Sequence, residues 1–133
     1  MKRPRFRIYL WIALAAMCGG GLRALIATLP LAVSVATLTA NLLGALAIGL
    51  FWALCGPEGR FAFTAEHRLV VMTGFLGSLT TFSMAGVHSA SGLLDGETIA
   101  ALGHAMLTLL GALLAAGLGL SLGRLLGRRI TKR

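Results

Sequence analysis

The chain has 133 residues, of which 57% are hydrophobic and only 12% charged, and its mean hydropathy is +0.88. A soluble domain carries about 25% charged residues, so this composition predicts an integral membrane protein. The net charge of +8 does not indicate nucleic-acid binding, because the basic residues flank apolar segments instead of mixing with aromatic residues on a polar surface.

Four apolar segments are long enough to cross a bilayer, at about residues 8–29, 31–55, 68–94 and 98–122. Each crossing needs about 20 apolar residues, so the sequence predicts one all-α, four-span membrane domain over residues 1–133. Eleven of the twelve basic residues lie in the N-terminal flank, the second loop and the C-terminal flank. By the positive-inside rule, both termini are expected in the cytoplasm of a bacterium, with the chain in the inner (plasma) membrane.

Two polar residues stand out in the first two segments. Arg23, near the far end of the first, either extends to the lipid headgroups or forms a vestibule that attracts anions. Asn41, in the second, has two amide donors and an acceptor to satisfy. It either joins two helices by hydrogen bonds or lines a pore, and both interpretations stay open.

The third segment contains Gly-Phe-Leu-Gly-Ser-Leu-Thr-Thr-Phe-Ser at residues 74–83. Gly77 weakens a helix, and the hydroxyl groups that follow can bond the backbone, so an interrupted helix is expected around Gly77. An unpaired peptide group in hydrocarbon costs several kcal/mol, so the interruption must be buried in protein or line a wet cavity. It is therefore a candidate functional site.

The absence of acidic residues from the spans argues against two other functions, a proton-coupled exporter and an enzyme. No Asp or Glu lies inside the spans, whereas a proton-coupled exporter of cationic drugs needs an embedded carboxylate. His88 and His104 are expected to be packed side chains instead of a proton relay. No buried acid is available to orient a histidine beside a serine, so we expect no enzyme activity.

Three motifs, in chain order, resemble those of the Fluc (CrcB) family of small fluoride channels. They are Gly19-Gly20 with Arg23, the run from Thr37-Leu38 through Asn41 and Gly44 to Gly49, and residues 74–83. The resemblance implies an antiparallel dimer of four-helix subunits, each with a broken third helix, that exports cytoplasmic fluoride passively. It also implies a structural sodium ion held by the backbone carbonyls of Gly77 and Thr80, and a pore lined by Asn41, Thr81, Phe82 and Ser83.

Two features depart from the family pattern. Ala85 stands where a second pore phenylalanine is expected, and the strong charge bias conflicts with a subunit that inserts in both orientations. The expected partners are therefore fluoride, membrane lipid, and either a second copy in an antiparallel homodimer or an oppositely oriented paralogue. The alternative function is a non-conducting or orientation-specific subunit of a heterodimeric channel, and a more distant one is a small-solute exporter.

Overall fold

The described part of the chain is arranged as four helical spans. The structure is a computed structural model that describes residues 6–131, with side chains through Arg128, and this part of the chain contains no β-strand. The first, second and last spans are α1 (Phe6–Ala27), α2 (Val33–Cys55) and α6 (Thr98–Thr131). The third span, Ala65–Leu94, is divided into α3 (Ala65–Leu69), the π-helical segment η1 (Val70–Leu76), α4 (Gly77–Leu79) and α5 (Phe82–Leu94). All four spans are long and apolar enough to cross a membrane, as predicted.

The helix bounds differ from the sequence prediction at several ends. α2 begins at Val33, because Thr28 to Leu31 form a turn stabilised by backbone hydrogen bonds. The third span begins at Ala65, where the Thr64 side chain accepts a hydrogen bond from the His67 N–H and caps the helix. α6 continues past residue 122 to Thr131, because its last turns contain no proline and their leucines and arginines outnumber the two glycines, Gly123 and Gly127.

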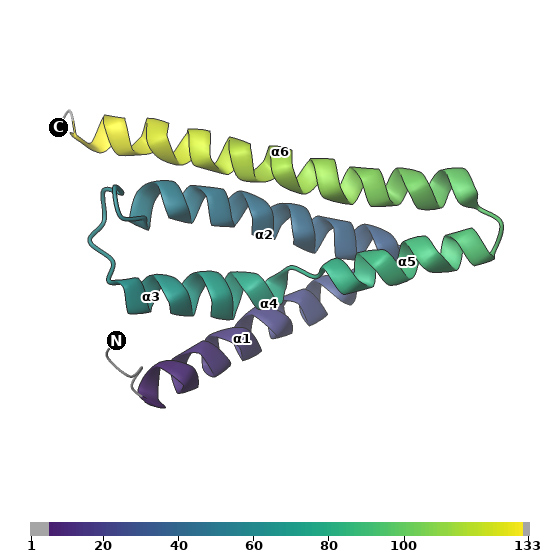
Figure 1. Cartoon of the computed structure of the whole chain (residues 1–133), viewed down its shortest axis with the longest axis horizontal. Helices are drawn as coiled ribbons and strands as arrows, with labels where there is room; N and C mark the ends of the chain where they lie inside the picture. The colour runs from purple at the N-terminus through teal and green to yellow at the C-terminus, as the bar shows by residue number, and fades with distance from the viewer. Residues whose placement is uncertain (1–5, 132–133) are drawn as a thin grey trace.

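The ends of the bundle differ in charge. The start of α1, the α2–α3 loop with α3, and the end of α6 all lie together (Figure 1), and these segments contain the basic residues Arg7, Arg60, Arg68, Arg124 and Arg128. We call this the basic end. The α1–α2 and α5–α6 loops lie at the opposite end. The placement is the one that the positive-inside rule requires of a single orientation.

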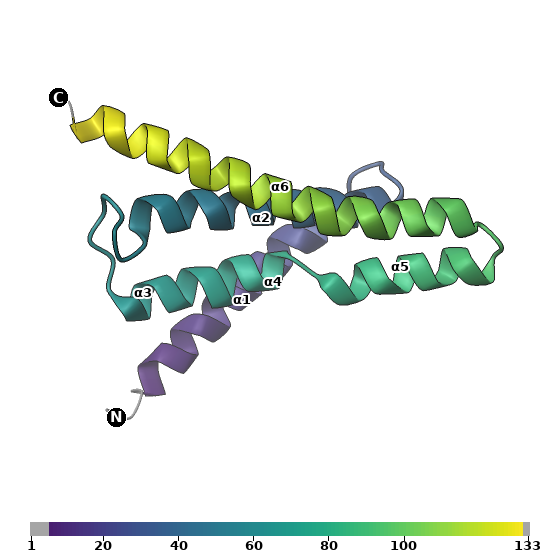
Figure 2. The ribbon, with the colours of Figure 1, turned by 45° about the horizontal axis from the view of Figure 1, so that its top comes forward.

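α2 and α6 lie side by side along most of their length (Figures 1 and 2), in the most extensive helix contact of the fold. Glycines set the distance between them. A Cβ atom on Gly49 would collide with the Ala116 carbonyl, and one on Gly119 would collide with the Leu46 carbonyl and come within 2.9 Å of the Leu50 nitrogen. Close backbone approach through small residues is how helices pack in lipid, where the hydrophobic effect between them is absent.

α1 crosses the third span and holds the segment before the break (Figure 2). A Cβ atom on Gly74 of η1 would lie 2.9 Å from the Ile12 carbonyl, and one on Gly19 of α1 would collide with the Phe75 carbonyl and the Ser78 hydroxyl. Gly20 has open space instead. In the Gly19-Gly20 motif, therefore, the first glycine makes the close contact.

Candidate functional site at the break in the third span

The third span is interrupted at Thr80 and Thr81, between α4 and α5. Both have extended backbones, with φ −85° and ψ 152° at Thr80 and φ −149° and ψ 117° at Thr81. The sequence placed the interruption at Gly77, but Gly77 is helical, with φ −65° and ψ −31°. The helix continues because the Gly77 N–H still bonds backwards to the Gly74 and Met72 carbonyls. The break comes three residues later, where another helix supplies replacement hydrogen bonds.

Asn41 of α2 supplies them. Its Nδ2 donates to the Thr81 carbonyl over 2.9 Å, and its Oδ1 accepts from the Thr81 N–H over 2.7 Å. This two-way pairing fixes the orientation of the side-chain amide, because only one arrangement matches donors to acceptors. Asn41 is 5% exposed, so the pairing replaces two backbone hydrogen bonds at a buried position. Of its two amide protons, one is used by Thr81, and the other has no acceptor among the described residues.

Gly44 lets the break approach α2. It lies one turn after Asn41 on the same face of the helix, and a Cβ atom there would collide with the Thr80 methyl group. The Thr80 hydroxyl turns back and donates to the Leu76 carbonyl over 3.2 Å. Asn41 and Gly44 thus hold the two broken residues from one side, by hydrogen bonding and by close packing respectively.

The break brings two opposite helix ends together. The last carbonyls of α4 present partial negative charge, and the first N–H groups of α5 present partial positive charge. Thr81 caps α5, since its hydroxyl accepts from the Met84 N–H over 3.4 Å and shares a hydrogen bond of 3.1 Å with the Ser83 hydroxyl. A cation and an anion can therefore be stabilised within a few residues of each other.

Phe82 begins α5 and is 71% exposed on the surface of the single chain. It borders an open groove of about 380 Å³ that also includes Asn41, Thr80, Thr81 and Thr108. Four of the predicted site residues, Asn41, Thr80, Thr81 and Phe82, therefore line one groove. Ser83 does not line the groove but is hydrogen-bonded to Thr81, which does. Gly77 lies in α4, one turn before the break.

Residues 10–120 match a family model described as CrcB-like protein, Camphor Resistance (CrcB). The chain belongs to this family. Similar relatives carry the name fluoride-specific ion channel FluC. The one from Polynucleobacter asymbioticus is 35% identical over 120 residues, covering 84% of this chain and 94% of that relative. The one from Pasteurella multocida is 42% identical over 112 residues, covering 84% and 86%, and the one from Bordetella pertussis is 42% identical over 92 residues, covering 69% and 70%.

Ala85, which departs from the CrcB pattern, is 4% exposed between α5 and α6. It lines a cavity of about 90 Å³ together with Phe82, Ser89 and Thr108. The Ser89 hydroxyl is buried and has no hydrogen-bond partner among the described residues. The position that lacks a ring thus adjoins unfilled space beside Phe82.

His88 and His104 meet across α5 and α6. Their ring centroids are 6.0 Å apart at an interplanar angle of 86°, and His88 Nε2 lies 3.2 Å from the Thr37 hydroxyl of α2. His104 Nε2 is buried and has no partner in the described part of the chain. Both histidines lie between the break and the α5–α6 loop, away from the basic end.

Arg23 and the basic-end cavity lie outside the groove. Arg23 is partly buried on α1, one turn beyond Gly19 on the same face, and no hydrogen bond or ion pair joins it to another described residue.

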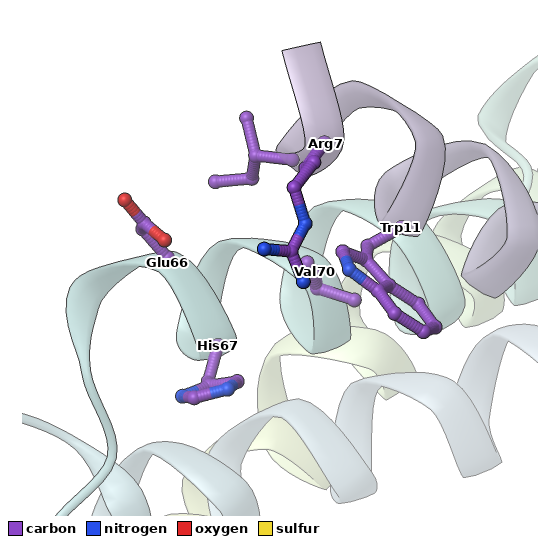
Figure 3. A pocket seen from close by; sticks show the side chains of 6 residues that line it. Arg7, Trp11, Glu66, His67 and Val70 are labelled. Carbon is purple, nitrogen blue, oxygen red and sulfur yellow. The ribbon is translucent and has the colours of Figure 1, made fainter. Parts of the chain in front are cut away.

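A separate cavity of about 460 Å³ lies at the basic end, where Arg7 and Trp11 of α1 face His67 of α3 (Figure 3). Trp and Arg are typical of the membrane–water boundary, and no predicted site residue lines this cavity.

Thr108 was missed as a site residue by the sequence analysis. It is 4% exposed, lines both the groove at the break and the cavity beside Ala85, and donates its hydroxyl to the His104 carbonyl over 2.9 Å. The available signal was a hydroxyl in the apolar α6, but a threonine can satisfy itself within its own helix. Only the packing of α6 against α5 identifies it as part of the site.

Proposed function

We propose that the chain is a subunit of a fluoride-selective channel through which cytoplasmic fluoride leaves the cell passively. The observation that carries the proposal is the spare amide proton of Asn41, held by the Thr81 pairing in the groove where α5 begins. The FluC name of the relatives supports the choice of anion. The function requires no catalytic step.

The groove offers weak, separate donors that suit a small anion. The positive edge of the Phe82 ring attracts fluoride without holding it tightly, and the start of the α5 dipole acts in the same sense. The hydroxyls of Thr81 and Ser83 lie in contact and can replace part of the hydration shell in turn. Several weak sites are what conduction needs, since an ion must leave as readily as it enters. Arg23 would raise the local anion concentration from a vestibule.

A sodium ion at the break belongs to the same proposal. Gly77 and Thr80 would hold it through their backbone carbonyl oxygens, which no longer have helical N–H partners at this point. Oxygen atoms of an interrupted helix are suitable ligands for Na⁺. The ion would supply positive charge at a break that contains no basic side chain.

A second subunit would complete the pore. Phe82 is 71% exposed and its groove is open on the surface of the single chain, so one chain forms only one wall. We propose an antiparallel dimer, in lipid, with either a second copy or an oppositely oriented paralogue as the partner. A paralogue is included because the cavity of about 90 Å³ beside Ala85 is also lined by the exposed Phe82. A ring from another chain would fill this space.

Fluoride efflux from liposomes tests the function. The purified chain, reconstituted alone, is expected to release fluoride and retain chloride, as measured with ion-selective electrodes. Asn41→Asp should reduce fluoride efflux about a hundredfold, because an oxygen that repels the anion replaces the spare donor. The Thr37→Val variant removes a different polar contact of α2, to His88, and should retain efflux.

The same liposomes decide between the two partners. Selective efflux from the lone chain, with termini labelled equally on both faces of the membrane, would support the homodimer. Efflux that requires co-expression with an oppositely biased paralogue would support the heterodimer. If neither preparation releases fluoride above protein-free liposomes, the channel proposal is wrong.

A further inference from the structure

Two carbonyl groups at the break lose their helical partners through two specific side chains. In an α-helix the carbonyl of each residue accepts from the N–H four residues later. The Gly77 carbonyl would accept from Thr81, but the Thr81 N–H donates instead to Asn41 Oδ1 over 2.7 Å. The Thr80 carbonyl would accept from Met84, but the Met84 N–H donates to the Thr81 hydroxyl over 3.4 Å.

Asn41 makes the stronger of these two diversions. The preceding N–H, that of Thr80, still bonds normally to the Leu76 carbonyl over 3.1 Å, so the helical pattern ends at the residue that Asn41 captures. The Gly77 carbonyl then keeps only a 3.5 Å contact from the Thr80 hydroxyl, which already donates to Leu76. An oxygen in this state can be satisfied by a cation.

We infer that Asn41 is a positioning residue for the sodium site, in addition to any contact with fluoride, because it removes the Thr81 N–H from Gly77 and thereby frees the Gly77 carbonyl. This rests on the sodium ion of the proposed function. Without an acceptor at position 41, the Thr81 N–H must either return to Gly77 and close the break or remain unpaired in a dry environment. The unpaired N–H is the costlier of the two outcomes in lipid, so the break is expected to close, and the Gly77 carbonyl is then lost as a cation ligand.

The side chain therefore has two separable parts. Oδ1 holds the Thr81 N–H and serves the cation, whereas the spare Nδ2 proton serves the anion. Aspartate keeps an oxygen in the Oδ1 position and removes both amide protons, including the one donated to the Thr81 carbonyl. Leucine has a similar size and removes the oxygen as well as the amide protons. The two variants consequently affect sodium and fluoride differently.

Thermal unfolding of the purified chain in detergent measures sodium binding without measuring transport. A cation that binds only the folded protein raises the unfolding midpoint, so the wild type should unfold about 5 °C higher in NaCl than in KCl of equal concentration. We expect Asn41→Asp to retain this sodium increment and Asn41→Leu to lose it. Thr37→Val is the matched control, because it removes a polar contact of the same helix one turn earlier and should keep the increment.

Four results would overturn the inference. These are a wild type without a sodium increment, an unchanged increment in Asn41→Leu, a lost increment in Asn41→Asp, or a lost increment in Thr37→Val. If Asn41→Leu does not fold, Asn41→Ala takes its place with the same expectation. A wild type that shows the expected sodium pattern but no fluoride efflux would contradict the proposed function and leave the role of Asn41 intact.

Discussion

The contacts that α2 makes with α6 and with the third span satisfy the backbone hydrogen bonds in different ways. Toward α6, the helix backbones satisfy their own hydrogen bonds, and glycines at positions 49 and 119 only bring them close together. Toward the third span, the backbone is open at Thr80 and Thr81, and α2 must also provide hydrogen bonds, through Asn41. Both contacts need a glycine, but only the second needs a polar side chain.

The difference separates stability from transport. In lipid, an intact helix needs only a partner of matching shape, whereas an open backbone needs donors and acceptors of its own. Substitutions in the α2–α6 contact should therefore affect the amount of folded protein. Substitutions at the break should alter transport at a smaller cost in folding.

The largest effect on folding is expected from Gly119→Ala. Its Cβ would collide with the backbone of α2 at Leu46, which cannot move without separating the helices. Overpacking of this kind costs about 1–3 kcal/mol, more than the gain of about 1 kcal/mol from replacing a helical glycine. We expect a lower unfolding midpoint and a lower yield of monodisperse protein in size-exclusion chromatography.

Gly117→Ala provides the control two residues away on α6. A Cβ atom there meets nothing within 4 Å, so only the helix propensity changes and the midpoint should rise slightly or stay the same. Equal midpoints for the two variants would contradict the close α2–α6 contact.

Gly44→Ala at the break is expected to have a smaller effect, and this effect is on fluoride efflux. The new methyl would meet the Thr80 methyl, so Thr80 must shift and the groove must change shape. We expect fluoride efflux to fall about tenfold, equivalent to about 1.4 kcal/mol. Thr80→Ser removes the obstructing methyl and keeps the hydroxyl, so efflux from the double variant should return to within about twofold of the wild type. Failure of the second change to restore efflux would show that the two methyls do not meet.

The number and type of spans followed from composition, because about 20 consecutive apolar residues allow few arrangements in a bilayer. The site was harder to predict. Gly77 has the lowest helix propensity near the break, yet it is helical, because the position of the break is set by a partner on α2 that is 40 residues away in sequence. The two interpretations of Asn41 also proved compatible in geometry, since pairing with Thr81 uses one amide proton and leaves the other. The helix propensities of the residues near the break could predict neither its position nor the pairing of Asn41 with Thr81.

A still smaller effect on folding, with a selective effect on transport, is expected from Phe82→Leu. Phe82 is 71% exposed in the single chain, so its removal should change the free energy of unfolding of that chain by no more than about 0.5 kcal/mol. Loss of the positive ring edge should lower efflux about tenfold. Leu113→Ala, at an equally exposed position (71%) in the same groove, should leave efflux unchanged. An equal loss in both variants would mean that the groove needs only apolar bulk.

The smallest effect is expected from Ala85→Phe, which restores the ring that this chain lacks. The side chain would enter the cavity of about 90 Å³ next to Phe82, so part of the added volume fills empty space and the rest must be accommodated by α6. If a second ring edge improves the pore, efflux should rise about twofold, because one aromatic contact contributes about 0.5 kcal/mol at the lower limit. Ala85→Leu fills the same space without a ring and should give no increase. A gain in both variants would assign the effect to packing between α5 and α6. A gain that appears only with the ring, and only in the chain reconstituted alone, would mean that a partner chain normally supplies the missing aromatic wall.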